Sequence, residues 1–217
     1  MTIDWSIIAK ALPLLAEGAI VTVQVSVLSA ILGLALGVVL GLVSLSRNRP
    51  LKWLVAGYVD FIRGTPLLIQ IFLVFFALPV VGIRFDEFWA GVVALSLNAA
   101  AFVAEVVRGG VGSIEKGQTE AARSIGMRER QILVDILLPQ AYRQMIPPLT
   151  NELISLVKNS SLLSVISVYE LTRAGQAIIS IHFVPFEIFT LLALYYYVMI
   201  KGLSILSKKL EERLPKW

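Results

Sequence analysis

The chain has 217 residues, of which 57% are hydrophobic and only 16% are charged. Soluble domains contain about 45–50% apolar residues with glycine included and about 25% charged residues, so this composition excludes a water-soluble enzyme and indicates an integral membrane protein. The formal net charge of +4 is typical of a membrane protein whose basic residues stay on the cytoplasmic side, and nucleic acid is not an expected partner.

We expect an all-α fold with about five membrane-spanning helices, forming a single domain over residues 1–217. A helix needs about 20 mostly apolar residues to cross the hydrocarbon core, and apolar stretches of that length recur along the chain. The expected spans are residues 18–45, 62–83, 88–107, 144–168 and 183–207. The fourth is less apolar than the others because it contains Glu152 and Lys158.

Glycines recur in the first expected span. Gly33, Gly37 and Gly41 are spaced four residues apart, which places them along one face of a helix. Small residues in this pattern let two helices approach closely in lipid. We therefore assign these glycines to helix packing.

The second expected span contains a proline, Pro66. Proline has no amide hydrogen, so it frees the carbonyl four residues earlier, that of Ile62, from its helical hydrogen bond. Irregular backbone at membrane depth is typical of segments that line a cavity, and Thr65 and Gln70 lie beside this break. A local kink without solute contact is the alternative interpretation.

The third expected span carries polar groups on one face. Asn98 lies near its middle, where an amide contacts either a solute or a neighbouring helix. Glu105 lies near the cytoplasmic end, and we expect it to pair with Arg108, three residues later. By the same spacing, Asp60 and Arg63 are expected to form an ion pair at the membrane interface.

Residues 108–143 form a connection too long for a simple turn, and we interpret it as a cytoplasmic segment. Its apolar residues recur at helical spacing between charges. Gly126 allows a sharp change of direction, and Pro139 is expected to end the helical pattern. We expect two short amphipathic helices joined at Gly126, which either lie on the membrane surface or contact a partner protein.

The fourth expected span holds Glu152 and Lys158 six residues apart, about 240° apart around a helix. They cannot form an intrahelical ion pair, so each needs another helix, a cavity or a solute. Lys158 together with Ser161 would suit the carboxylate of an amino acid, and Glu152 would suit its ammonium group or a basic side chain. The alternative is that both residues make contacts between subunits.

The distribution of basic residues predicts the orientation. Most of the 19 lysines and arginines fall in the first and third connections and in the carboxyl-terminal tail. They are Arg47, Arg49, Lys52, Arg108, Lys116, Arg123, Arg128, Arg130, Arg143, Lys201, Lys208, Lys209, Arg213 and Lys216. Because basic residues favour the cytoplasmic side, the amino terminus is expected outside and the carboxyl terminus in the cytoplasm.

One set of residues in the expected cytoplasmic segment, 108–143, has a characteristic spacing: Glu120, Ala121, Ala122, Gly126, Ile136, Leu138 and Pro139. This set resembles the cytoplasmic coupling motif of the inner-membrane permeases of ATP-binding-cassette (ABC) importers. Three further stretches resemble the branch of that family that takes up polar amino acids: RGTPLLIQ at residues 63–70, NAAAFVAE at 98–105 and KNSSL at 158–162. Phe102 stands where this branch is expected to have tyrosine.

The resemblance implies a multi-pass permease subunit in a bacterial-type cytoplasmic (inner) membrane, within the lipid bilayer. Its implied partners are a second copy or a related permease chain, ATP-binding cassette ATPase subunits, an extracytoplasmic amino-acid-binding protein and an amino acid substrate. ATP and Mg would bind the ATPase subunits, and the matching positions in residues 120–139 would couple to them. The candidate substrate pocket comprises Thr65, Gln70, Asn98, Glu152, Lys158 and Ser161.

No catalytic, cofactor or metal site is expected on this chain. It has no cysteine and one histidine, His182, which excludes thiolate chemistry and a histidine-rich metal site. The closest approach to a phosphate-binding loop is at residues 112–119, where Gln118 takes the lysine position and no strand precedes the turn. ATP hydrolysis is therefore expected on a separate subunit.

Other classes of membrane protein fit the sequence less well. The main alternative is an ion-gradient-driven secondary amino acid transporter, but such proteins commonly contain internal repeats, and none is evident. A membrane scaffold or sensor would conduct no solute. An intramembrane enzyme would need a catalytic pair, and none lies at suitable spacing in the spans.

Overall fold

The computed structural model describes residues 5–46 and 48–212, and every regular element in these ranges is a helix. Of the basic residues used for the orientation, Arg47, Arg213 and Lys216 lie outside the described residues. The elements are α1 (Trp5–Ser44), α2 (Arg49–Gly64), α3 (Leu67–Phe72), η1 (Leu73–Ala77), η2 (Leu78–Val81), α4 (Glu87–Gly112), α5 (Lys116–Ser124), α6 (Glu129–Gln131), η3 (Ile132–Leu137), α7 (Leu138–Asn159), η4 (Ser160–Ile166), α8 (Leu171–His182) and α9 (Pro185–Glu212).

Three helices are long and apolar enough to cross a membrane, at Ser6–Ser44, Glu87–Gly112 and Pro185–Lys209. The helical segments Arg49–Gly64 and Leu67–Val81 would add a fourth crossing if they form one bent span. Length and composition thus identify three or four spanning helices in the described residues, where the sequence predicts about five. The predicted span that is missing from this count is the fourth. Helix α7 covers most of it and carries charged side chains.

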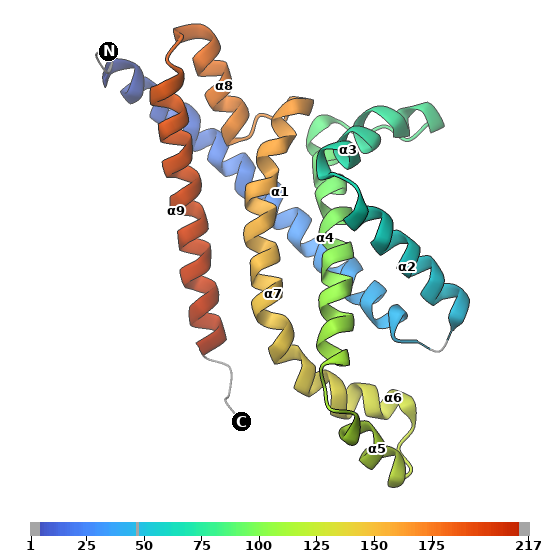
Figure 1. Ribbon diagram of the computed structural model, residues 1–217. Coiled ribbons are helices and arrows are strands. Elements are labelled where there is room, and N and C mark those ends of the chain that lie inside the picture. Colours follow the sequence, from blue (N-terminus) through green and yellow to red (C-terminus); the bar gives the residue numbers. More distant parts are fainter. Residues whose placement is uncertain (1–4, 47, 213–217) are drawn as a thin grey trace.

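The predicted second span is broken rather than straight. Helix α2 ends at Gly64, Thr65 is extended at φ −119° and ψ 146°, and α3 begins after Pro66. The residue before proline is pushed out of the helical region by the proline ring, which explains the position of the break. The two helical segments meet at 110°, and Figure 1 shows α3 turning away from α2.

Helix α4 is the centre of the fold (Figure 1), and 72% of its most apolar stretch is buried. Its start is fixed by Asp86, whose carboxylate accepts a hydrogen bond from the Trp89 amide at 2.8 Å in the usual manner of a helix cap. The glycines of α1 pack directly on it. A Cβ added to Gly37 would lie 2.5 Å from the Cβ of Val103, so the predicted packing role is confirmed.

Helix α8 is anchored by Glu170, a buried carboxylate that sequence reasoning missed. Its oxygens accept hydrogen bonds from the amides of Thr172 and Arg173, at 2.9 and 2.8 Å, and from the hydroxyl of Tyr196 at 2.8 Å. The carboxylate therefore caps α8 and ties it to α9. This end of the molecule lies opposite α5 and α6 in Figure 1.

The segment expected in the cytoplasm contains α5 and then a helix that continues without interruption from α6 through η3 into α7. The prediction that Pro139 ends this helical pattern is wrong. Pro139 lies in the first turn of α7, and the preceding turn, Ile132–Leu137, is π-helical. The wider turn accommodates the proline because a π-helix shifts the hydrogen bonds by one residue, away from the clash that a proline ring makes four residues back.

Candidate functional site

A cavity of about 300 Å³ lies where α2, α4 and α7 meet, and we call it the inner cavity. Its lining includes four residues of the candidate substrate pocket: Thr65, Asn98, Glu152 and Lys158. The volume is at the lower end of about 300–1,000 Å³, the range of small-molecule sites. The structure therefore brings together polar side chains from three separate parts of the chain.

Gln70 lies behind this wall and links its members. Its amide nitrogen donates to the Ile62 carbonyl at 2.7 Å and to the Thr65 hydroxyl at 3.0 Å, while its amide oxygen accepts from the Asn98 amide at 2.9 Å. Gln70 and Asn98 are 4% and 6% exposed. Asn98 therefore makes the interhelical contact considered from sequence and also lines the cavity.

Glu152 and Lys158 both face the inner cavity although they lie on different sides of α7. Among the described residues, neither side chain has a hydrogen-bond or ion-pair partner. Ser161 is not part of the lining, and its hydroxyl donates to the Lys158 carbonyl at 2.7 Å. One cavity thus holds a carboxylate and an ammonium group without a partner in the described chain.

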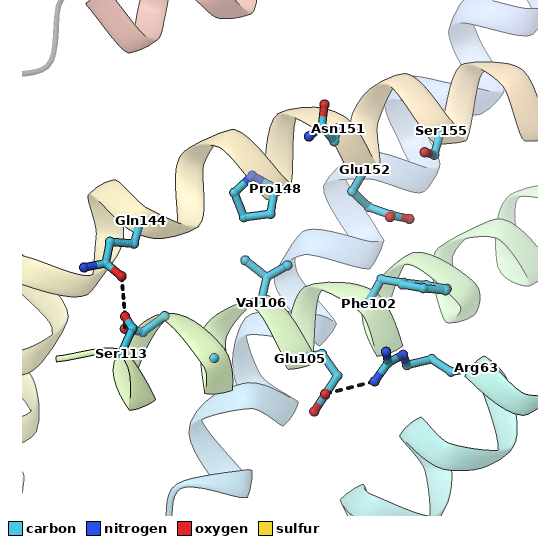
Figure 2. Close-up of a pocket in the computed structure, with 12 residues that line it drawn as sticks. Arg63, Phe102, Glu105, Val106, Ser113, Gln144, Pro148, Asn151, Glu152 and Ser155 are labelled. Carbon is cyan, nitrogen blue, oxygen red and sulfur yellow. Dashed lines mark hydrogen bonds and ion pairs between the residues drawn. The ribbon is translucent and has the colours of Figure 1, made fainter.

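A second cavity of about 500 Å³, which we call the outer cavity, lies between α4 and α7 toward α5. Arg63, Phe102, Glu152 and Ser155 line both cavities, and Figure 2 shows how these side chains lie. At the far end of the outer cavity, Ser113 is hydrogen-bonded to Gln144 (Figure 2). The two cavities therefore share a wall and lie next to each other along α4 and α7.

An ion-pair cluster borders the shared wall. Glu105 accepts from Arg108 at 2.7 Å, which confirms the predicted pair, and from Arg63 at 2.9 Å. The prediction that Arg63 pairs with Asp60 is wrong, because the helix packing of α2 on α4 places the Glu105 carboxylate within reach. Local spacing identified only the partner on the same helix.

Sequence reasoning left several lining residues out of the candidate pocket: Arg63, Phe102, Ser155 and Asn159. Helical spacing could have found Ser155, since it stands three residues after Glu152 and three before Lys158 and so lies between them around α7. Phe102 stands four residues after Asn98. Arg63 gives no such signal, because its place depends on the break at Pro66.

The turn between α5 and α6 is built around Gly126. Its φ of +81° lies in the left-handed region, which strains any residue with a Cβ. The Gly126 amide donates to the Arg123 carbonyl at 2.9 Å and the Met127 amide to the Ala122 carbonyl at 3.1 Å. This pair of bonds is a Schellman motif, so the glycine fixes where α5 stops.

The surface of this turn exposes part of the predicted coupling set. Glu120 and Ala121 are exposed, whereas Ala122 is buried, so the two alanines do not share one open face. Ile125, at the tip of the turn, is 78% exposed. The tip of this turn is therefore open to solvent.

Arg123 and Glu129 bridge the turn with two hydrogen bonds of 3.0 and 3.3 Å. Hydrogen bonding to Glu129 raises the pKa of Arg123 above its ordinary value. Both side chains are about half exposed, and surface ion pairs of this kind contribute little to stability.

The later part of the coupling set faces the helical core. Ile136 and Leu138 are half-buried and Pro139 is exposed. Leu138 packs against a cluster that contains Val107 and Val111 at the end of α4. The segment therefore has an exposed tip and a base packed on the helices that line the cavities.

The described residues contain no group of three or more His, Asp and Glu side chains that could hold a metal ion. The side chains of Thr65, Asn98, Glu152 and Lys158 offer ion pairing and hydrogen bonding in the inner cavity. These groups suit reversible binding of a small polar molecule.

Comparison with known proteins extends over nearly the whole chain. Residues 33–216 match the family described as binding-protein-dependent transport system inner membrane components. The arginine transport system permease protein ArtQ of Bacillus subtilis is 40% identical over 215 residues, which cover 99% of this chain and 98% of that protein. The glutamine transport system permease protein GlnP of Escherichia coli K12 is 39% identical over 220 residues and 99% of both chains.

A solved structure shows the same architecture. The crystal structure of an amino acid ABC transporter with histidines contains a chain that matches 99% of this one, with a TM-score of 0.92 and 37% sequence identity. The match covers 100% of that chain. The arrangement of helices described above therefore occurs in an experimentally determined transporter.

Proposed function

The chain belongs to the family of binding-protein-dependent transport system inner membrane components, and on that premise we propose that it carries a polar amino acid across the membrane. It is a permease subunit of an ATP-driven ABC importer. We further propose its substrate, its membrane topology and its partners.

The observation that carries the substrate proposal is the inner cavity, with Glu152 and Lys158 on one wall. An amino acid has an ammonium group and a carboxylate, and each would meet a group of opposite charge. Thr65 and Asn98 add hydrogen-bonding groups held in place by Gln70. Charged groups at membrane depth are costly and usually serve a solute path, which supports binding over a role as contacts between subunits.

We propose five spans, with α7 and η4 as the fourth. Their residues 138–166 run beside α4 (Figure 1). Glu152 and Lys158 face a cavity, which is how charged groups are accommodated in a membrane. With an odd number of spans, the termini lie on opposite faces. The basic connections then put the carboxyl terminus and α5 in the cytoplasm of a bacterial-type inner membrane.

The exposed turn at Ile125 and Gly126 is the proposed contact for an ATP-binding cassette ATPase subunit, which would bind ATP and Mg. Because Leu138 packs on the end of α4, movement of the turn would reach both helices that line the cavities. A second permease chain would complete the path, and an extracytoplasmic binding protein would deliver the amino acid. Rocking of the two halves would alternate access to the cavity.

The test is uptake by proteoliposomes that contain the purified complex with its binding protein. Labelled arginine, glutamine and histidine are supplied outside, with ATP enclosed. Uptake of at least one of them that requires enclosed ATP supports the proposal. Uptake driven by an ion gradient without ATP would instead support the secondary-transporter alternative, and no uptake of any amino acid would reject the proposed substrate class.

A further inference from the structure

Arg63 lies at the boundary between the inner and outer cavities, and neither the pocket nor the coupling assignment uses it. It comes from the end of α2 and lines both cavities. Its guanidinium carbon is 5.7 Å from the centre of the Phe102 ring. Figure 2 shows that ring between Arg63 on one side and Glu152 of α7 on the other.

The present partner of Arg63 is a carboxylate that has a second cation. Glu105 binds Arg63 at 2.9 Å and also holds Arg108 through two hydrogen bonds, of 2.7 and 3.0 Å. If Arg63 leaves, Glu105 remains paired with Arg108. Movement of Arg63 therefore does not leave a partly buried carboxylate without a cation, which would be unfavourable.

A second carboxylate is available across the cavities. Glu152 lines the same two cavities and has no ion-pair or hydrogen-bond partner among the described residues. The Arg63 side chain is 46% exposed, and the Phe102 ring and the ion pair to Glu105 are its contacts. A half-exposed cation thus has one carboxylate that it shares and another, on the facing helix, that is unpaired.

We propose that Arg63 is a movable barrier between the two cavities, open while its guanidinium binds Glu105 and closed when it crosses to Glu152. The inference rests on the proposed function, in which Glu152 holds the ammonium group of the solute. Arg63 and the solute then compete for one carboxylate. While a solute is bound to Glu152, Arg63 stays on Glu105 and the barrier is open. Once the solute has moved to the outer cavity, Arg63 binds Glu152 and prevents the solute from returning.

The test uses cysteine labelling, which is clean because the chain has no cysteine of its own. Asn159→Cys places the reporter in the lining of the inner cavity alone, and Ser113→Cys places a matched reporter in the outer cavity alone. Inverted membrane vesicles containing the whole complex, without ATP or solute, are treated with a neutral, sugar-linked methanethiosulfonate. A neutral reagent is chosen so that charge substitutions do not change its local concentration.

Glu105→Gln removes the carboxylate that holds Arg63 in the open position. We expect labelling of the Asn159→Cys reporter to become about fivefold slower or more, the lower end of typical coupling between sites. Adding Glu152→Gln should restore the parent rate, because the closed position then has no carboxylate. The Ser113→Cys reporter should be labelled at the same rate in all three backgrounds.

An unchanged or faster rate in Glu105→Gln would overturn the proposal, as would slow labelling that persists in the double variant. If Glu105→Gln fails to reach the membrane, Arg63→Gln replaces it. In Arg63→Gln, the Asn159→Cys reporter should be labelled at least as fast as in the parent. Adding Glu152→Gln to that variant should leave the labelling rate unchanged, and a changed rate would also overturn the proposal. Labelling can be measured without transport. If the labelling rates follow the expected pattern but the complex takes up no amino acid, the proposed function is contradicted and the barrier role of Arg63 is not.

Discussion

The side-chain amide of Gln70 donates a hydrogen bond of 2.7 Å to the main-chain oxygen of Ile62. This is the carbonyl that Pro66 deprives of its helical partner, since proline lacks the amide that would bond to it. Gln70 thus replaces the missing amide from the next helix and fixes the 110° bend between α2 and the helical segment that follows it. The same side chain holds Thr65 and Asn98, so the break and the cavity wall depend on one residue.

Gln70→Leu should therefore destabilise the protein and impair uptake. It leaves the buried Ile62 carbonyl and the Asn98 amide without this partner, and each buried unsatisfied group costs about 1–3 kcal/mol. Thermal unfolding of the detergent-purified complex measures the loss. Gln24→Leu makes the same chemical change at an exposed position of α1 and should leave the melting temperature unchanged. Equal melting temperatures for the two variants would refute the bracing role of Gln70.

Gly37→Val should separate α1 from α4. The new Cβ would lie 2.5 Å from the Cβ of Val103 and 2.7 Å from the Ala100 carbonyl, and relief requires the helices to move apart. Overpacking of this kind costs about 1–3 kcal/mol, so the yield of folded protein and its melting temperature should fall. Gly57→Val is the control, because a Cβ at Gly57 meets nothing within 4 Å. A normal melting temperature for Gly37→Val would contradict the packing described.

Gly126→Val should abolish ATP-dependent uptake by weakening the contact with the ATPase subunit. Space is not the obstacle, since a Cβ there meets no atom within 4 Å. The obstacle is φ of +81°, because a left-handed conformation costs about 1–2 kcal/mol for a residue with a Cβ and the turn would rearrange. Gly117→Val is the control, because it introduces the same side chain within helix α5 at a position where a Cβ meets no atom within 4 Å.

The measurement for this pair is ATP-dependent uptake together with the amount of ATPase subunit retained on purification. We expect Gly126→Val to reach the membrane in normal amounts but to lose both. Gly117→Val should keep both, with at most a small loss from helix propensity. Full uptake in Gly126→Val would remove the coupling role from this turn.

Lys158→Ala should weaken binding of the solute carboxylate. A hydrogen bond to a charged group contributes about 1.5–3 kcal/mol, so the amino acid concentration that half-maximally stimulates ATP hydrolysis should rise about tenfold or more. Hydrolysis without solute should remain. Lys208→Ala, on an exposed part of α9, is the control for the loss of one positive charge. An unchanged solute response in Lys158→Ala would remove it from the pocket.

The sequence predicts features that depend on neighbours along the chain. The spacing of Gly33, Gly37 and Gly41 predicts a packing face, and proline chemistry predicts the break at Pro66. The pair of Glu105 with Arg108 follows from positions three residues apart on a helix. Each depends on local geometry, which a pattern of residue types specifies.

Other features depend on distances that no local pattern contains. The Arg63–Glu105 pair joins two helices whose relative position is set by the bend, and the link from Gln70 to Asn98 crosses to a third element. Pro139 shows a different difficulty, because a π-helical turn relieves the clash that usually ends a helix at proline. Glu170 was not predicted because a lone acid in the sequence gives no indication that the amides of Thr172 and Arg173 and the hydroxyl of Tyr196 donate to it.

The most direct test of the account is ATP hydrolysis by the complex purified from its native membrane together with its binding protein, measured with each amino acid in turn. We predict that an ATPase subunit accompanies this chain and that a subset of polar amino acids accelerates hydrolysis. The Lys158→Ala complex should need more amino acid for the same acceleration. Hydrolysis that no amino acid changes, in a preparation that still takes up amino acids under an ion gradient alone, would contradict the account.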